Sequence, residues 1–155
     1  MADAIAMNIT EPTSDERTMA ILAHVLQVVA WWIAPLIIFL VKPESRFVRF
    51  HALQALLLQI VYALLLMACG LVWFATFFWT IASGAPAHNA PPPPAFFLIF
   101  FLIWSGFMAA WVAVLVVAIL YGVKAGRGEW AEYPVLGRLA RRFLKLGPGG
   151  VSLQV

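Results

Sequence analysis

The polar residues best suited to chemistry lie on one face of a long apolar segment. If that segment is one α-helix at about 100° per residue, these side chains fall within about 80° of His51. The residues of this polar seam are His51, Gln54, Gln59, Tyr62, Cys69, Thr76 and Thr80, joined by His24 and Gln27 from the preceding apolar segment. The seam could line a conducting path or a binding groove between helices. Alternatively, its side chains turn inward and hydrogen-bond between helices, at about 0.6 kcal/mol each, and we favour this interpretation.

Other site chemistries find little support in the sequence. His24, His51 and His88 belong to different predicted elements, no pair has helical ligand spacing, and Cys69 is the single cysteine, so we expect no metal site. There is no phosphate-binding glycine loop, no pair of carboxylates within an apolar segment and no serine beside a suitable base. We therefore expect no catalytic residues, no cofactor and no enzyme activity.

The distribution of charge predicts an integral membrane protein. Of 155 residues, 64% are hydrophobic and 11% are charged, against roughly a quarter charged in soluble domains. The charged residues fall into an acidic N-terminal group, a basic group at 42–49 and a basic group from Lys124 onward, so that residues 50–123 carry no Asp, Glu, Lys or Arg. The absence of charge deep in the apolar segments argues against an active transporter.

Three apolar segments are long enough to cross a bilayer, which needs about 20 residues of helix. We predict an all-α integral membrane protein with three transmembrane helices, over residues 18–41, 53–82 and 95–123, and an interfacial amphipathic C-terminal helix. Residues 1–17 form an acidic N-terminal segment, residues 18–126 the membrane domain and residues 127–155 a basic cytoplasmic tail. Pro35 should kink the first span because it removes a backbone donor.

Orientation follows from the Lys and Arg residues, because short loops rich in them stay cytoplasmic. The first connection and the tail are both basic and are separated by two spans, whereas the proline-rich turn at 83–94 has no charge. This places the N-terminus outside and the C-terminus inside the bacterial inner membrane. In the alternative arrangement, residues 18–41 form a re-entrant hairpin broken near Pro35, and both termini lie inside.

Two further groups of residues predict contacts. Small residues spaced by four in the third span allow close approach of another helix. They are Gly106, Ala110, Ala118, Gly122 and Gly126. In the tail, basic and apolar residues alternate at helical spacing, so that Arg138, Arg141, Arg142 and Lys145 can reach anionic lipid headgroups at about 1 kcal/mol each. Beside a membrane span, nucleic acid is a weaker candidate for these charges, and we expect no nucleic-acid partner.

Three stretches together resemble a known family. They are residues 16–24 (ERTMAILAH), residues 35–38 with 45–56 (PLII and SRFVRFHALQAL), and residues 126–140 (GRGEWAEYPVLGRLA). This pattern resembles the small bacterial membrane proteins related to the Tic-twenty component of the chloroplast import machinery, many of which form a domain of unknown function. The resemblance implies a small helical membrane protein that works within a larger assembly, and it assigns no catalytic residues.

The sequence supports two functions of different classes. The first is a structural or accessory subunit that packs against other membrane proteins, suggested by the small-residue stripe, the basic tail and the uncharged spans. The second is a channel or protein-translocation component whose path is lined by the polar seam. An accessory subunit should co-purify with larger partners, whereas a pore former should conduct in liposomes.

Overall fold

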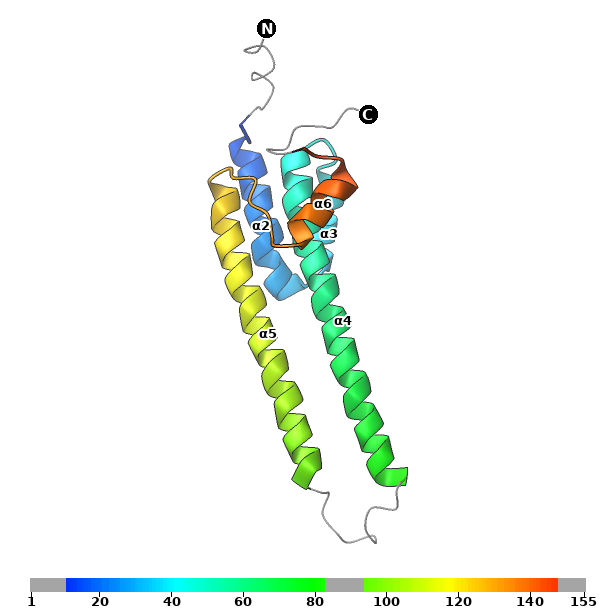
Figure 1. Cartoon of the computed structure of the whole chain (residues 1–155). Helices are drawn as coiled ribbons and strands as arrows, with labels where there is room; N and C mark the ends of the chain where they lie inside the picture. Colours follow the sequence, from blue (N-terminus) through cyan, green and yellow to red (C-terminus); the bar gives the residue numbers. More distant parts are fainter. Residues whose placement is uncertain (1–10, 83–93, 148–155) are drawn as a thin grey trace. The chain divides into compact units, whose positions relative to one another are not determined.

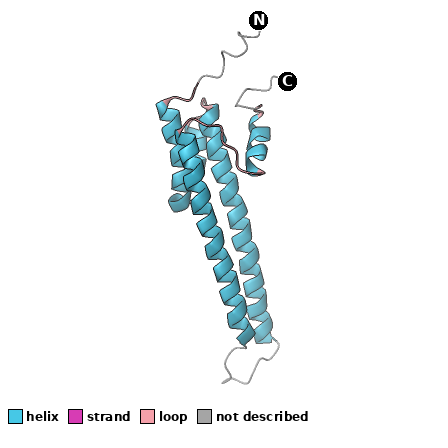
Figure 2. Ribbon diagram, turned by 60° about the vertical axis from the view of Figure 1, so that its left-hand side comes forward, coloured by secondary structure: helices cyan, strands magenta, loops and turns pink. Residues whose placement is uncertain are grey.

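The computed structural model describes residues 11–82 and 94–147, and every regular element in these ranges is an α-helix (Figures 1 and 2). Most of the acidic N-terminal segment, the proline-rich turn with His88 and the end of the tail lie outside the described residues. The chain divides into two compact units. Unit 1 comprises residues 1–60 and 114–155, and unit 2 comprises residues 61–113.

Helix α2 (Ser14–Ala30) begins with a capping box. The Thr13 hydroxyl accepts from the Glu16 backbone N–H at 3.2 Å, and the Glu16 carboxylate accepts from the Thr13 N–H at 2.8 Å. Two donors that a helix start leaves unpaired are thus satisfied. Asp15 and Glu16 also place negative charge at the positive end of the helix dipole.

The first apolar segment is not one helix. Helix α2 ends at Ala30, Trp31 adopts φ 55°, and α3 (Ile33–Val41) starts two residues later with Pro35 in its first turn. A proline ring crowds the carbonyl four residues earlier, here that of Trp31, but fits in a first helical turn. The chain therefore breaks before Pro35 instead of kinking at it.

The two short helices form a hairpin. Lys42, just after α3, donates to the Asp15 carboxylate at 2.7 Å, so the end of α3 lies beside the start of α2. Neither helix supplies an apolar bilayer span, because α3 has 9 residues and α2 has 17, of which the first four are polar. The prediction of three transmembrane helices is therefore wrong, and the hairpin geometry matches the alternative in which this segment is broken near Pro35.

Two helices are long and apolar enough to cross a membrane: α4 (Arg46–Ala82) and α5 (Pro94–Gly126). Ser45 caps α4 by accepting from the Val48 N–H at 3.2 Å, and Pro94 opens α5 where its missing N–H costs nothing. With 37 residues, α4 exceeds the length that one bilayer requires. It begins at Arg46, seven residues before the predicted span.

Unit 1 is built from α2, α3, the first part of α4, the last part of α5 and α6 (Leu136–Leu144) (Figure 1). Small residues lie where the helices of this unit meet: Ala20, Ala23 and Ala52 are completely buried. One cluster joins α2, α3 and α4 through Ala23, Ile38 and Val48, and another joins α4 and α6 through Phe50 and Ala140. Unit 1 thus holds the buried core in which most of the polar seam lies.

Candidate functional site

Five residues of the predicted polar seam are buried together in unit 1. His24 and Gln27 come from α2, and His51, Gln54 and Gln59 come from the first part of α4. Each is at most 3% exposed. Tyr133, from the segment between α5 and α6, completes this group, which we call the buried polar cluster.

A chain of hydrogen bonds runs through the cluster. The Tyr133 hydroxyl lies 2.8 Å from His24 Nδ1, and His24 Nε2 lies 3.0 Å from His51 Nδ1. His51 Nε2 lies 3.1 Å from the backbone carbonyl oxygen of Glu129. Two histidines from different helices are thereby linked to the segment that follows α5.

The Glu129 carbonyl oxygen, the last acceptor, fixes which atom donates in every hydrogen bond of this series. A carbonyl oxygen can only accept, so His51 Nε2 carries a proton and, in a neutral ring, His51 Nδ1 is the acceptor. His24 Nε2 must then donate, which leaves His24 Nδ1 to accept from the Tyr133 hydroxyl. The geometry therefore assigns both imidazoles to the neutral Nε2–H tautomer, with three donors and three acceptors matched.

Two glutamines fix neighbouring backbone. Gln54 donates to the carbonyl oxygen of Ala131 at 3.2 Å and accepts from the Tyr133 N–H at 2.6 Å. Gln59 donates to the Gln27 carbonyl oxygen at 2.9 Å, near the end of α2. Both ends of the Gln54 amide are thus used to hold residues 131–133 against α4.

At the edge of the cluster, the hydrogen-bonding groups of Gln27 are less well satisfied. Gln27 Nε2 lies 3.5 Å from the Tyr133 hydroxyl oxygen, at the limit of a hydrogen bond, and Gln27 Oε1 is buried with no partner among the described residues. Burial raises the pKa of the Tyr133 phenol, so the hydroxyl stays protonated and remains the donor to His24. The cluster contains no formally charged side chain.

Close packing surrounds the cluster. Tyr121 of α5 donates to the Glu132 carbonyl oxygen at 2.9 Å, and its ring packs edge-on against Tyr133 at 4.3 Å between centroids. A Cβ at Gly137 would lie 2.6 Å from Glu132 Cβ and 2.9 Å from Gln54 Oε1. Glycine is therefore required where α6 begins. Because its donors and acceptors, apart from those of the Gln27 amide, are used internally, the cluster can position helices but presents little to a ligand.

The remaining seam residues belong to unit 2, and the described bonds of two of them are local. Thr76 donates to the Trp73 carbonyl oxygen and Thr80 to that of Thr76, both at 2.8 Å within α4. The Tyr62 hydroxyl is buried with no partner among the described residues, and Cys69 is a free, half-buried thiol. Hydroxyls that bond their own helix backbone need no neighbouring helix.

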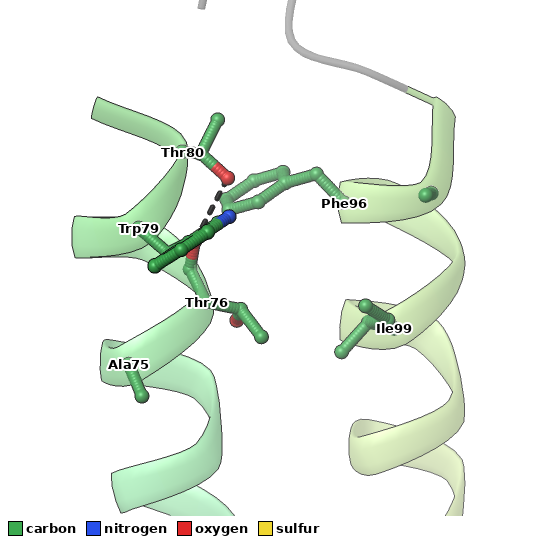
Figure 3. Close-up of a pocket in the computed structure, with 7 residues that line it drawn as sticks. Ala75, Thr76, Trp79, Thr80, Phe96 and Ile99 are labelled. Carbon is green, nitrogen blue, oxygen red and sulfur yellow. Dashed lines mark hydrogen bonds between the residues drawn. The ribbon is translucent and has the colours of Figure 1, made fainter. Parts of the chain in front are cut away.

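Unit 2 contains a mainly apolar pocket of about 430 Å³ between α4 and α5 (Figure 3). The residues that line it are Ala75, Thr76, Trp79, Thr80, Ala95, Phe96 and Ile99. In Figure 3 the Thr80 hydroxyl points to the backbone of its own helix. The pocket presents no charged side chain, so it offers no evident chemistry.

The small-residue stripe of α5 divides between the units. In unit 1, a Cβ on Gly122 would lie 3.7 Å from His24 Cβ, and one on Gly126 would lie 3.0 Å from Ile21 Cδ1, so both glycines face α2. Ala118 is also buried. In unit 2, Gly106 has no heavy atom within 4 Å of its Cβ position among the described residues.

The four basic residues of the tail do not act alike. Arg138 and Arg142 on α6 and Lys145 at its C-cap are exposed. Arg141 instead bonds Glu132 and the Gly147 carbonyl oxygen, and its guanidinium lies over the Phe50 ring at 5.3 Å. Arg141 thus has a role inside unit 1 that its sequence spacing did not reveal.

Sequence reasoning also missed the role of Tyr133. Tyr133 lies within the stretch 126–140, but a partner 109 residues from His24 cannot be found from helical periodicity. The available signal was the tyrosine-proline pair that lies three residues before Gly137. Among the described residues, no group of three or more His, Cys, Asp or Glu is arranged to hold a metal ion.

The fold and the cluster together define a small helical protein with two long apolar helices and a polar core tied to its C-terminal segment. Residues 15–140 match the model of the magnetosome magnetite crystal formation protein family, MamF/MmsF. The chain belongs to this family. The suggested likeness to Tic-twenty-related proteins was therefore wrong: the residues quoted for it from position 16 onward lie within the MamF/MmsF match. Searches of curated proteins and of solved structures each gave no match.

Proposed function

We propose that this protein is a non-catalytic, multi-pass component of the magnetosome membrane that supports magnetite crystal formation as an accessory subunit. The family match over residues 15–140 is the observation that carries the proposal. The helices α4 and α5 supply the two membrane crossings.

The buried polar cluster supports a structural role. His24, His51 and Tyr133 satisfy one another, and Gln54 is used to hold backbone, so these side chains serve to fix α2, α4 and the segment before α6. A catalytic site would instead expose a base or nucleophile to an open pocket. The exposed small residues of α5 around Gly106 offer a surface for a larger membrane protein.

The hairpin of α2 and α3 bears on topology. Because it returns Lys42 to Asp15, the start of α2 and the basic connection lie on the same side of unit 1. With two crossings, we propose that both termini lie on the cytoplasmic side, where the basic connection belongs. The outward N-terminus expected from the sequence depended on a third span. Reporter fusions at each terminus, assayed in intact cells, test this arrangement.

A translocation path remains the second candidate, and Tyr62 favours it. Its hydroxyl is buried in unit 2 without a described partner, as a path-lining group would be before water or substrate enters. Reconstituted protein would then conduct in liposomes, and Tyr62→Leu would change the flux while Leu64→Ile on the exposed side of α4 would not.

The main test is complementation in a magnetite-forming bacterium. Removal of the gene should alter the number or size distribution of crystals seen by electron microscopy, and the wild-type gene should restore them. Gentle extraction should also recover the chain at fixed stoichiometry with larger magnetosome membrane proteins. Unchanged crystals together with the absence of the protein from purified magnetosomes would contradict the proposal.

A further inference from the structure

Helix α6 carries three distinct faces. With Gly137 at 0°, Ala140, Arg141 and Leu144 fall within about 60° of it and face α4. Arg138 and Arg142 lie at about 100° and 140°, and Leu139 and Phe143 lie at about 200° and 240°. Lys145 and Val135 flank the helix as its C-cap and N-cap. The second and third faces are exposed, with Val135 and Phe143 at 72% and 68%.

The basic face has no described carboxylate to neutralise it. Between Lys124 and Gly147 the two carboxylates are engaged elsewhere, Glu132 with Arg141 and Glu129 near Arg127 at 3.9 Å. Three cations therefore remain beside an apolar stripe. Cationic and apolar side chains next to each other are suited to a surface that offers both anions and an apolar medium.

The position of α6 in unit 1 indicates which surface this is. Ala140 and Leu146 pack with Phe50, Leu53 and Leu57 of α4, in the first three turns after Arg49. Arg49 is the last charged residue before the uncharged interval 50–123. Helix α6 therefore lies at the level where the chain passes from charged to uncharged sequence, which for a membrane-crossing helix is the headgroup layer.

We propose that the exposed faces of α6 form a docking surface for anionic lipid headgroups, with Arg138, Arg142 and Lys145 binding the anions and Val135, Leu139 and Phe143 inserted toward the acyl chains. Arg141 takes no part, because it is committed to Glu132. A second copy fits less well, since a symmetric contact would bring two basic stripes together. This inference concerns lipid binding and is independent of the role in crystal formation.

The test follows the environment of Phe143 in the full chain. Phe143→Cys in a Cys69→Ala background is labelled with an environment-sensitive fluorophore and placed in nanodiscs of phosphatidylcholine, with or without phosphatidylglycerol. Acrylamide, an uncharged quencher, reports water access. We expect the anionic lipid to lower quenching about threefold, and high salt to reverse the effect by screening.

Charge-matched variants identify the residues responsible. Arg138→Gln with Arg142→Gln and Lys145→Gln should abolish the dependence on anionic lipid, each charge being worth about fivefold in binding. The control variant, Arg46→Gln with Lys124→Gln and Arg127→Gln, removes the same charge from other surfaces. It should keep the dependence of quenching on anionic lipid. Circular dichroism checks that both variants keep their helix content.

Several outcomes would overturn the proposal. Equal quenching in the two lipid compositions would show that α6 does not dock on anionic headgroups. Equal losses in both triple variants would indicate a bulk charge effect. Protection in neutral detergent that grows with protein concentration would show that a second copy covers α6 instead.

Discussion

The two units contain similar polar residues on the same helix but use them differently. In unit 1, His51 and Gln54 of α4 bond to other segments through completely buried side chains. In unit 2, Thr76 of α4 bonds its own helix backbone. A polar face on a helical wheel therefore does not define one continuous site. Whether a polar side chain on this face links helices depends on whether another segment of the chain lies within hydrogen-bond distance of it.

The largest expected effect comes from removing Gln54, which serves two backbone groups at once. Gln54→Leu leaves the buried Tyr133 N–H and the partly buried Ala131 carbonyl oxygen without their partner. At about 1–3 kcal/mol for each of these two unsatisfied groups, the free energy of unfolding should fall by about 2–6 kcal/mol. Thermal unfolding in detergent micelles measures this, with Thr76→Val in unit 2 as the control. Similar losses in both variants would remove the distinction between the units.

The second prediction compares two glycines. Gly137→Ala places a methyl group 2.6 Å from Glu132 Cβ and should destabilise the protein by about 1–3 kcal/mol through overpacking. Gly106→Ala meets no atom within 4 Å among the described residues and should be neutral or slightly stabilising. Unfolding midpoints of the two variants give the answer, and a tolerated Gly137→Ala would show that α6 packs more loosely than described.

The third prediction concerns Tyr133 and alkaline pH. Burial raises its pKa above the ordinary value of 10.0, so the neutral phenol is favoured in the folded protein. The corresponding stability is fully present below pH 10.0 and is lost as pH rises through the folded pKa. Tyr133→Phe should lower stability at neutral pH by about 1–3 kcal/mol, because His24 Nδ1 loses its donor, and should reduce the alkaline loss.

Stability of the wild type and of Tyr133→Phe is measured between pH 7 and 11, with Tyr62→Phe in unit 2 as the comparison. Parallel pH profiles for the wild type and Tyr133→Phe would show that another group controls the alkaline transition.

The smallest effect is expected at the hairpin surface. Lys42 and Asp15 form an exposed ion pair at 2.7 Å, and solvent screening keeps the contribution of such pairs small. The Asp15 hydrogen bond raises the pKa of Lys42 above 10.5, so this contribution is present below that pH and is lost above it. Lys42→Met should cost little at low salt and nothing at high salt. A larger loss would mean that this pair, and not apolar packing, holds α2 on α3.

Part of this structure follows from sequence periodicity and part does not. The helical class and the inward face of His24 and Gln27 could be predicted because they depend on residues close in sequence, whereas the break near Pro35 was only the alternative to a kinked span. The span count was wrong because composition alone does not show that α2 and α3 are too short to cross separately. Tyr133, the Glu129 carbonyl and the pairing of Arg141 depend on contacts between distant segments, which no local pattern records.

The most direct test of the buried polar cluster is nitrogen-15 NMR of histidine-labelled protein in micelles or nanodiscs at neutral pH. The hydrogen-bond chain predicts that His24 and His51 are both neutral, with the proton on Nε2 and Nδ1 unprotonated. In Tyr133→Phe the Nδ1 resonance of His24 should shift because its donor is gone, while that of His51 should change less. A charged imidazolium, or a proton on Nδ1 of either ring, would contradict the arrangement that links α2, α4 and the segment before α6.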